Sequence, residues 1–151
     1  MVTKVGLQQD IFDALKDLIE LDLDAIEAYD AALNRLEDTS YKTTMSSFKD
    51  DHHRHVKELS DYLIKHKHQP PQKGDLKKIL TQGKVIISEL FGDNAIIGAM
   101  KSNEVDTKTA YKRMLTYDGI DDALNEILQR GFNDERRHFA WMETHHDKSF
   151  D

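Results

Sequence analysis

The feature that most constrains the fold of this chain is an apolar stripe with alternating spacings of three and four residues. It runs through a first segment of about residues 7–36, where Asp22 is the one charged member. Comparable stripes occupy about residues 41–66, 94–117 and 121–146. Side chains at this spacing lie on one face of an α-helix, so each segment is expected to bury one face against the others.

Turn-forming residues separate these segments. Short polar turns at 37–40 and 117–121 follow the first and third segments. Both prolines lie in the loop 67–75, and a shorter helical piece is expected over 76–90. The chain therefore alternates two short turns with one long connection.

This arrangement predicts an all-α fold, an antiparallel four-helix bundle with a helical crossover between the second and third long helices. A length of 151 residues fits one domain spanning 1–151. Asp93 and Asp121 stand where each is expected to cap the helix that follows.

Composition excludes several classes of function. A net charge of −7 argues against nucleic-acid binding, which needs a basic face. The sequence contains no apolar run of membrane-spanning length and no signal-peptide pattern at its start, so a cytoplasmic location is expected. The absence of cysteine excludes disulfides, iron–sulfur clusters and thiolate zinc sites.

Ionisable residues replace apolar ones near the middle of each stripe. They are Asp22 in the first segment, His52 and His55 in the second, Glu104 in the third, and Glu135 and His138 in the fourth. With a rise of about 1.5 Å per residue, all of them are expected at one level of the bundle. Glu20 and Glu27 lie off the first stripe and are expected to face solvent, as are Arg136 and Arg137.

Burying carboxylates without compensation costs several kcal/mol, and carboxylates in one layer repel each other. A bound metal ion solves both problems, and oxygen and imidazole donors suit iron, manganese or zinc. The alternative is a metal-free network in which the histidines pair with the carboxylates.

The two halves of the sequence echo each other. Tyr29 follows Asp22 by seven residues, and Tyr111 follows Glu104 by the same interval. Because seven residues make two helical turns, each tyrosine is expected on the face of its own carboxylate, as a hydrogen-bonding partner behind the metal ligands.

These motifs resemble those of the ferritin-like superfamily in its bacterioferritin and rubrerythrin form, and the chain is similar to small ferritin-like bundles of bacteria. The motifs are "DLDAIEAY" (22–29), "HHRH" (52–55), "EVDTKTAY" (104–111) and "ERRH" (135–138), within a resemblance over about residues 7–146. The resemblance implies that the family's acidic ligands correspond to Asp22 and Glu104, and its Glu-x-x-His pair to Glu135 and His138.

The second helix departs from the family pattern. Where the family has Glu-x-x-His, the apolar stripe selects His52 and His55, while the acidic alternative, Asp50 and His53, would turn polar residues into the core. One of two bridging glutamates is then missing, and a di-iron site becomes weaker, asymmetric or replaced by a single metal.

The resemblance implies a non-haem di-iron protein that oxidises Fe(II) or reduces O₂ or peroxide, in a context of oxidative stress. Two iron ions are expected, with manganese or zinc as alternatives. Electrons come from Fe(II) or a separate donor, and the resemblance implies a homodimer. The competing hypothesis is a non-catalytic metal-binding protein or a metal-free structural bundle related to stress.

Overall fold

The long helices of the protein follow the predicted stripes. The computed structural model describes residues 3–72 and 86–150, and all regular secondary structure among them is helical. The elements are α1 (Ile11–Arg35), α2 (Thr39–Lys65), α4 (Asp93–Leu115), α5 (Asp122–His145) and a short 3-10 helix, η3 (Lys148–Phe150). The all-α prediction is confirmed.

The helical piece expected over 76–90 falls mostly on residues 73–85, which lie outside the described residues. Residues 86–88, at its end, are helical.

Aspartates determine where the helices begin. Asp10 accepts hydrogen bonds from the backbone N–H groups of the first turn of α1, and this is why α1 starts at residue 11 instead of 7. Asp38 and Asp121 cap α2 and α5 in the same way. Asp93 was expected to cap α4, and this prediction is wrong, because the position before α4 is Gly92, with a φ of 88°.

The Asp93 carboxylate instead contacts the start of α2. It accepts hydrogen bonds from the backbone N–H groups of Glu37 and Asp38, at 2.8 and 2.9 Å. Those N–H groups precede a helix and have no partner within it, so Asp93 ties the α1–α2 turn to α4.

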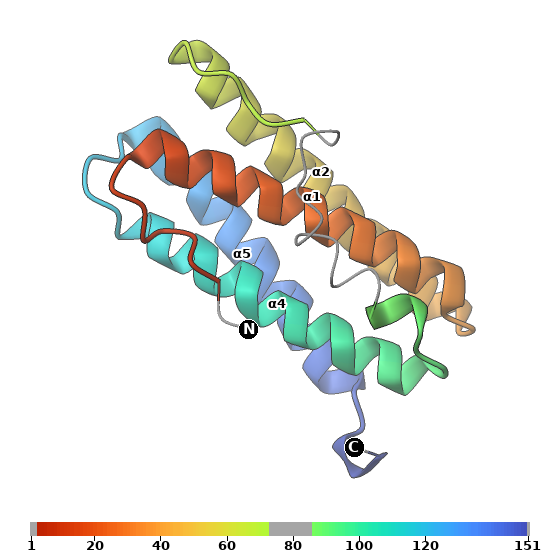
Figure 1. The fold of residues 1–151 in the computed structure, drawn as a ribbon. Helices are drawn as coiled ribbons and strands as arrows, with labels where there is room; N and C mark the ends of the chain where they lie inside the picture. The colour runs from red at the N-terminus through yellow and green to blue at the C-terminus, as the bar shows by residue number, and fades with distance from the viewer. Residues whose placement is uncertain (1–2, 73–85, 151) are drawn as a thin grey trace.

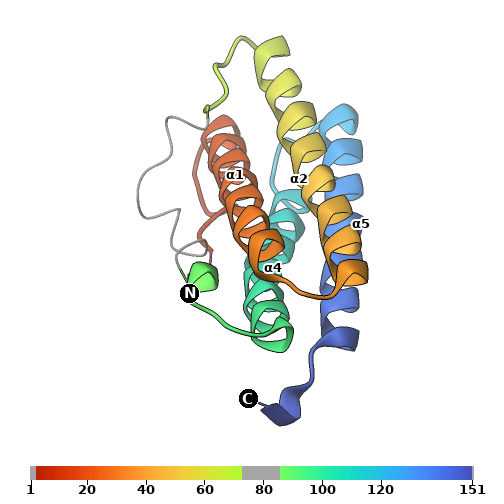
Figure 2. The same ribbon diagram turned by 90° about the vertical axis from the view of Figure 1, so that its right-hand side faces the viewer.

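The four long helices lie side by side as two antiparallel hairpins, α1 with α2 and α4 with α5 (Figure 1). The hairpins then pack so that α1 lies along α4 and α2 lies along α5, as the turned view makes clear (Figure 2). Each helix thus contacts two neighbours and turns one face toward a common interior.

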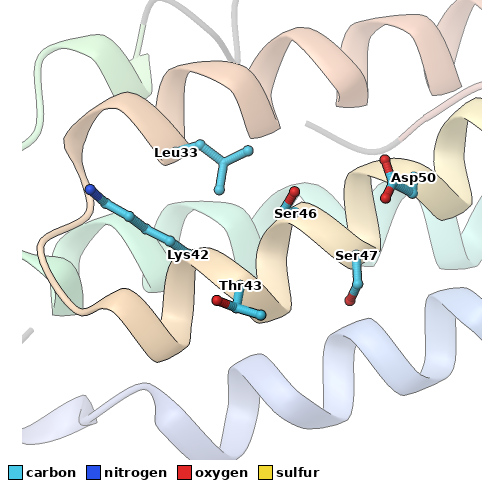
Figure 3. Close-up of a pocket in the computed structure, with 6 residues that line it drawn as sticks. All are labelled: Leu33, Lys42, Thr43, Ser46, Ser47 and Asp50. Atoms are coloured by element: carbon cyan, nitrogen blue, oxygen red, sulfur yellow. The ribbon is translucent and has the colours of Figure 1, made fainter.

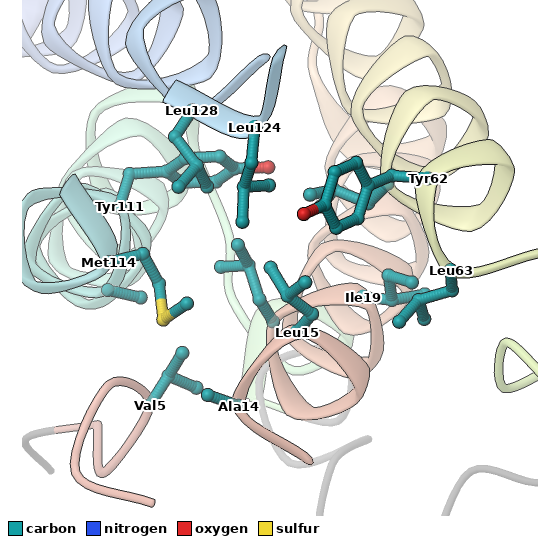
Figure 4. Packing of buried hydrophobic residues seen from close by; sticks show 13 residues of the cluster. Val5, Ala14, Leu15, Ile19, Tyr62, Leu63, Tyr111, Met114, Leu124 and Leu128 are labelled. Atoms are coloured by element: carbon teal, nitrogen blue, oxygen red, sulfur yellow. The ribbon is translucent and has the colours of Figure 1, made fainter. Parts of the chain in front are cut away.

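Two apolar clusters fill this interior. One holds Leu15, Leu18, Leu59, Leu63, Met114 and Leu128 with their neighbours (Figure 4). The other, near the α1–α2 turn, holds Ala32, Met45, Phe48, Ile97, Met100 and Met142 with theirs. On each of the four long helices the buried ionisable residues lie between these clusters, so a polar layer separates two apolar regions. Among the described residues, no helix is long and apolar enough to span a membrane.

Candidate metal centre

The six ionisable residues of the polar layer converge from four helices. Their exposed fractions lie between 0 and 3 %: Asp22, His52, His55, Glu104, Glu135 and His138. Their side chains form two overlapping groups of four donors, with the donor atoms of each group within 4.8 Å of one another. The first group is Asp22, His52, His55 and Glu135, and the second is His52, Glu104, Glu135 and His138.

The apolar neighbours of α2 determine which of its polar residues face inward. Met45, Phe48 and Leu59 are buried on one face of the helix, and the two histidines lie on that face between them. Asp50 and His53, the alternative pair, are exposed.

His55 and His138 are held in matching ways. Nε2 of His55 donates to Asp134 at 2.9 Å, and Nε2 of His138 donates to Asp51 at 2.8 Å. A carboxylate can only accept, so in both rings Nε2 carries the proton and Nδ1 faces the centre. Such outer carboxylates fix the tautomer and the orientation of metal-binding histidines.

His52 has a different environment. Its Nδ1 lies 2.8 Å from Asp22 Oδ1 and 3.6 Å from Glu135 Oε1, while its Nε2 lies 3.5 Å from Glu104 Oε1. Both ring nitrogens therefore face carboxylates of the centre itself.

Glu135 lies between the two donor groups. Its Oε1 is 3.5 Å from His55 Nδ1, and its Oε2 is 3.8 Å from His138 Nδ1. Thr107 donates to Oε2 at 2.8 Å, from a buried hydroxyl whose role the sequence did not indicate. The two oxygens of one carboxylate thus point to different sides of the centre.

The buried tyrosines bind the carboxylates in a crossed arrangement. The Tyr29 hydroxyl donates to Glu104, and the Tyr111 hydroxyl donates to Asp22 at 2.7 Å. Each tyrosine was expected to lie against the carboxylate of its own helix, and that pairing is wrong. Two helical turns span about 11 Å along a helix, whereas the antiparallel packing of α1 on α4 brings each tyrosine level with the opposite carboxylate.

Asp51, Asp134, Arg54 and Arg137 form a charged network outside the histidines. Arg137 donates to Asp51 at 2.6 Å and to Asp134 at 3.0 Å, and Arg54 contacts the same two carboxylates. The apolar stripes do not predict this network, and Arg137, which was expected to face solvent, is instead paired with two carboxylates.

A sequence signal for the network does exist. Residues 51–55 read D-H-H-R-H and residues 134–138 read D-E-R-R-H, so an Asp-x-x-Arg-His motif occurs once in each half. In that alignment His52 is the equivalent of Glu135.

Glu27 is buried, with 7 % of its surface exposed, and the expectation that it faces solvent is wrong. Its neighbour Asp24 is half-buried, and burial together with the charge of Glu27 raises the pKa of Asp24 to about 7. These two acids lie outside both donor groups of the centre.

Protons are held tightly inside the centre. Burial, reinforced by the charge of Glu104, raises the pKa of Glu135 well above its usual range. Burial lowers the pKa of His52, but the charge of Glu135 and the contacts with Asp22 and Glu104 outweigh it and raise that pKa well above its usual range. Protons therefore supply part of the positive charge that the buried carboxylates need, and a metal ion would displace them.

A metal ion fits the donor atoms. Three of them are fully buried without a hydrogen-bond partner among the described residues: His52 Nε2, Glu135 Oε1 and His138 Nδ1. Buried polar atoms rarely remain unsatisfied. The inter-donor separations of 3.5 to 3.8 Å approach the spacing of roughly 3.4 Å expected for ligands about 2.1 Å from one tetrahedral ion. Buried histidine, aspartate and glutamate side chains are thus arranged in a way that can bind metal.

A pocket on the outer side of α1 and α2 is separate from the centre (Figure 3). It is lined by Leu33, Lys42, Thr43, Ser46, Ser47 and Asp50, and none of these belongs to the donor groups.

A family model described as "Domain of unknown function (DUF2383)" matches residues 10–117 of the chain. The chain belongs to this DUF2383 family. No curated protein and no solved structure matches it. The DUF2383 match covers α1, α2 and α4, and so includes Asp22, His52, His55 and Glu104, while Glu135 and His138 of α5 lie beyond it.

Proposed function

We propose that the protein is a ferritin-like four-helix bundle that binds two iron ions in its polar layer and oxidises Fe(II) with O₂ or peroxide. The observation that carries the proposal is a set of three buried atoms without a hydrogen-bond partner among the described residues, His52 Nε2, Glu135 Oε1 and His138 Nδ1, all on members of the two donor groups. In a buried site that contains three carboxylates, leaving these atoms unpaired costs free energy unless a cation binds to them.

The donor chemistry favours iron. Nitrogen and carboxylate donors without sulfur suit iron, manganese and zinc, and four protein donors at each position leave further coordination positions open for iron. Iron bound there supplies one-electron oxidation and reduction, which protein side chains do not provide. Fe(II) held there would supply the electrons: two Fe(II) would become two Fe(III), and the two electrons with two protons would convert one peroxide into two water molecules.

The residues of the chain have distinct roles in this proposal. Asp22 and Glu104 would hold the metal as terminal ligands, oriented by Tyr111 and Tyr29, and Glu135 would offer an oxygen to each donor group. The burial of these side chains, at most 2 % exposed, would keep bulk water from a bound ion. Since the chain contains no cysteine, electrons come from Fe(II) itself or from a separate donor protein.

The test combines metal content with spectroscopy. Protein purified without added metal is expected to contain iron or to take up two Fe(II) per chain under argon. Admission of air or peroxide is then expected to produce a near-ultraviolet ferric absorption band. Glu135→Ala should lose both the metal and the band, whereas Asp50→Ala, at an exposed position of α2, should lose neither.

The metal-free network remains the second candidate, and one observation favours it. His52 Nδ1 and His55 Nδ1 both approach Asp22 Oδ1, at 2.8 and 3.2 Å, as protonated histidines paired with a carboxylate would. In that case Glu135→Ala changes the free energy of unfolding, and neither the wild type nor the variant binds iron.

A further inference from the structure

Among the described residues, His52 differs from the other two histidines of the centre because it contacts no carboxylate outside the donor groups. His55 and His138 each use one nitrogen to bind an outer aspartate, so each has a single nitrogen for the centre. Both nitrogens of the fully buried His52 face the centre. An outer carboxylate would fix one proton on the ring, and His52 is free of that constraint.

The two nitrogens of His52 face different donor groups. Nδ1 lies against Asp22, which belongs to the first group, at 2.8 Å. Nε2 lies 3.5 Å from Glu104, which belongs to the second group, and has no hydrogen-bond partner among the described residues. The ring therefore stands between the two groups with one nitrogen on each side.

Glu135 has the same position in the other half of the sequence. It is the equivalent of His52 in the Asp-x-x-Arg-His motif, and its two oxygens also face opposite groups. The two residues that both donor groups share are these two.

We infer that His52 binds both metal ions at once, with Nδ1 on the first ion and Nε2 on the second, as an imidazolate. This inference rests on the proposed metal-binding function. A neutral imidazole has only one nitrogen with a free electron pair, so the second bond requires loss of the remaining N–H proton, which passes to water. From a ring that carries both N–H protons, two N–H bonds break and two metal–nitrogen bonds form, both protons pass to water, and no electron is transferred.

Charge balance supports the imidazolate. Asp22, Glu104 and Glu135 together supply three negative charges against the four positive charges of two divalent ions. A neutral His52 would leave one positive charge uncompensated in a fully buried site, which is costly. The imidazolate carries one negative charge and completes the neutralisation, as a second bridging glutamate would.

The bridge predicts the separation of the ions. The two nitrogens lie on opposite edges of the ring and each metal–nitrogen bond is about 2 Å, so the ions should lie about 6 Å apart. Two-metal sites bridged by oxygen have ions about 3.5 to 4 Å apart.

The experiment uses Zn(II), which binds the same donors without redox chemistry. Elemental analysis of the zinc-loaded protein should give two ions per chain, and anomalous diffraction at the zinc edge should locate them about 6 Å apart on either side of His52. A separation of about 3.5 to 4 Å, or a single zinc ion in the polar layer, overturns the bridge and leaves metal binding intact. Absence of zinc from the polar layer overturns both the bridge and the proposed function.

Two variants test the role of the ring. His52→Gln removes the anionic bridge and should reduce the zinc content from two ions to one. His53→Gln, at the exposed adjacent position, should retain two. Two ions in the His52→Gln protein would overturn the inference, and if that variant does not fold, the separation in the wild type decides the question.

Discussion

Gly131 of α5 provides the space in which the Tyr111 ring lies, and replacing it with alanine should damage the centre. A Cβ atom at position 131 would lie 2.8 Å from Cδ1 and 3.0 Å from Cζ of Tyr111. Real Cβ atoms essentially never approach other atoms more closely than 3.0 Å. The ring is buried among packed side chains, so it cannot move aside without displacing its hydroxyl from Asp22.

The magnitude follows from three contributions. Overpacking a dense core costs about 1 to 3 kcal/mol. Loss of the hydrogen bond to the Asp22 carboxylate costs about 1.5 to 3 kcal/mol, because the acceptor is charged. Alanine in place of glycine stabilises a helix by about 1 kcal/mol. The Gly131→Ala protein should therefore be less stable by about 2 to 5 kcal/mol.

Urea denaturation followed by circular dichroism measures this change. Gly98→Ala is the matched control, because its Cβ would contact the end of the partly exposed His146 side chain, 2.7 Å from Nε2, and that side chain can rotate away. The control should be neutral or more stable by up to about 1 kcal/mol. If Gly131→Ala is as stable as the wild type, or more so, the packing of Tyr111 against α5 does not constrain the centre as argued.

Two further predictions concern acidic residues. Asp51→Ala removes the acceptor of His138 Nε2, so the Zn(II) affinity of the protein, measured by chelator competition, should fall about 10- to 100-fold. Asp50→Ala, at an exposed position, should leave the affinity unchanged. Equal affinities in the two variants would contradict the orienting role of Asp51. Asp24 has a pKa raised from 3.8 to about 7, so its ionisation destabilises the folded protein progressively from about pH 4 to pH 7 and fully above that. Asp24→Asn should therefore increase the free energy of unfolding by about 1 to 3 kcal/mol at pH 8, because solvent partly screens the charge at a half-buried site. At pH 4 the increase should be much smaller. An equal increase at both pH values would refute the raised pKa of Asp24.

The sequence was sufficient to predict the helices and the side of α2 that faces inward. Helix formation and the direction of side chains depend on local spacing, and the stripe through Met45, Phe48 and Leu59 left one face for the two histidines between them. The lengths of the helices and turns were also sufficient to bring the ionisable residues to one level.

Contacts that depend on packing between helices were not predicted. The exchange of partners by Tyr29 and Tyr111 follows from how far α4 is shifted along α1, and no local pattern fixes that distance. The outer network was missed for another reason. Asp51 and Arg54 lie at the border between buried and exposed surface, where a stripe of apolar residues gives no information, and only the repeated Asp-x-x-Arg-His motif marks them.

The polar layer has a mechanical consequence for the whole molecule. Because this layer separates the two apolar clusters, the apolar side chains at one end of the bundle do not pack against those at the other end. We therefore expect each end to open locally while the other stays folded, so that amide protons near the α1–α2 turn exchange with solvent independently of those near the α4–α5 turn. A metal ion bound in the polar layer would couple the two ends into one cooperative unfolding unit. Metal binding should therefore lower the amide exchange rates at both ends together.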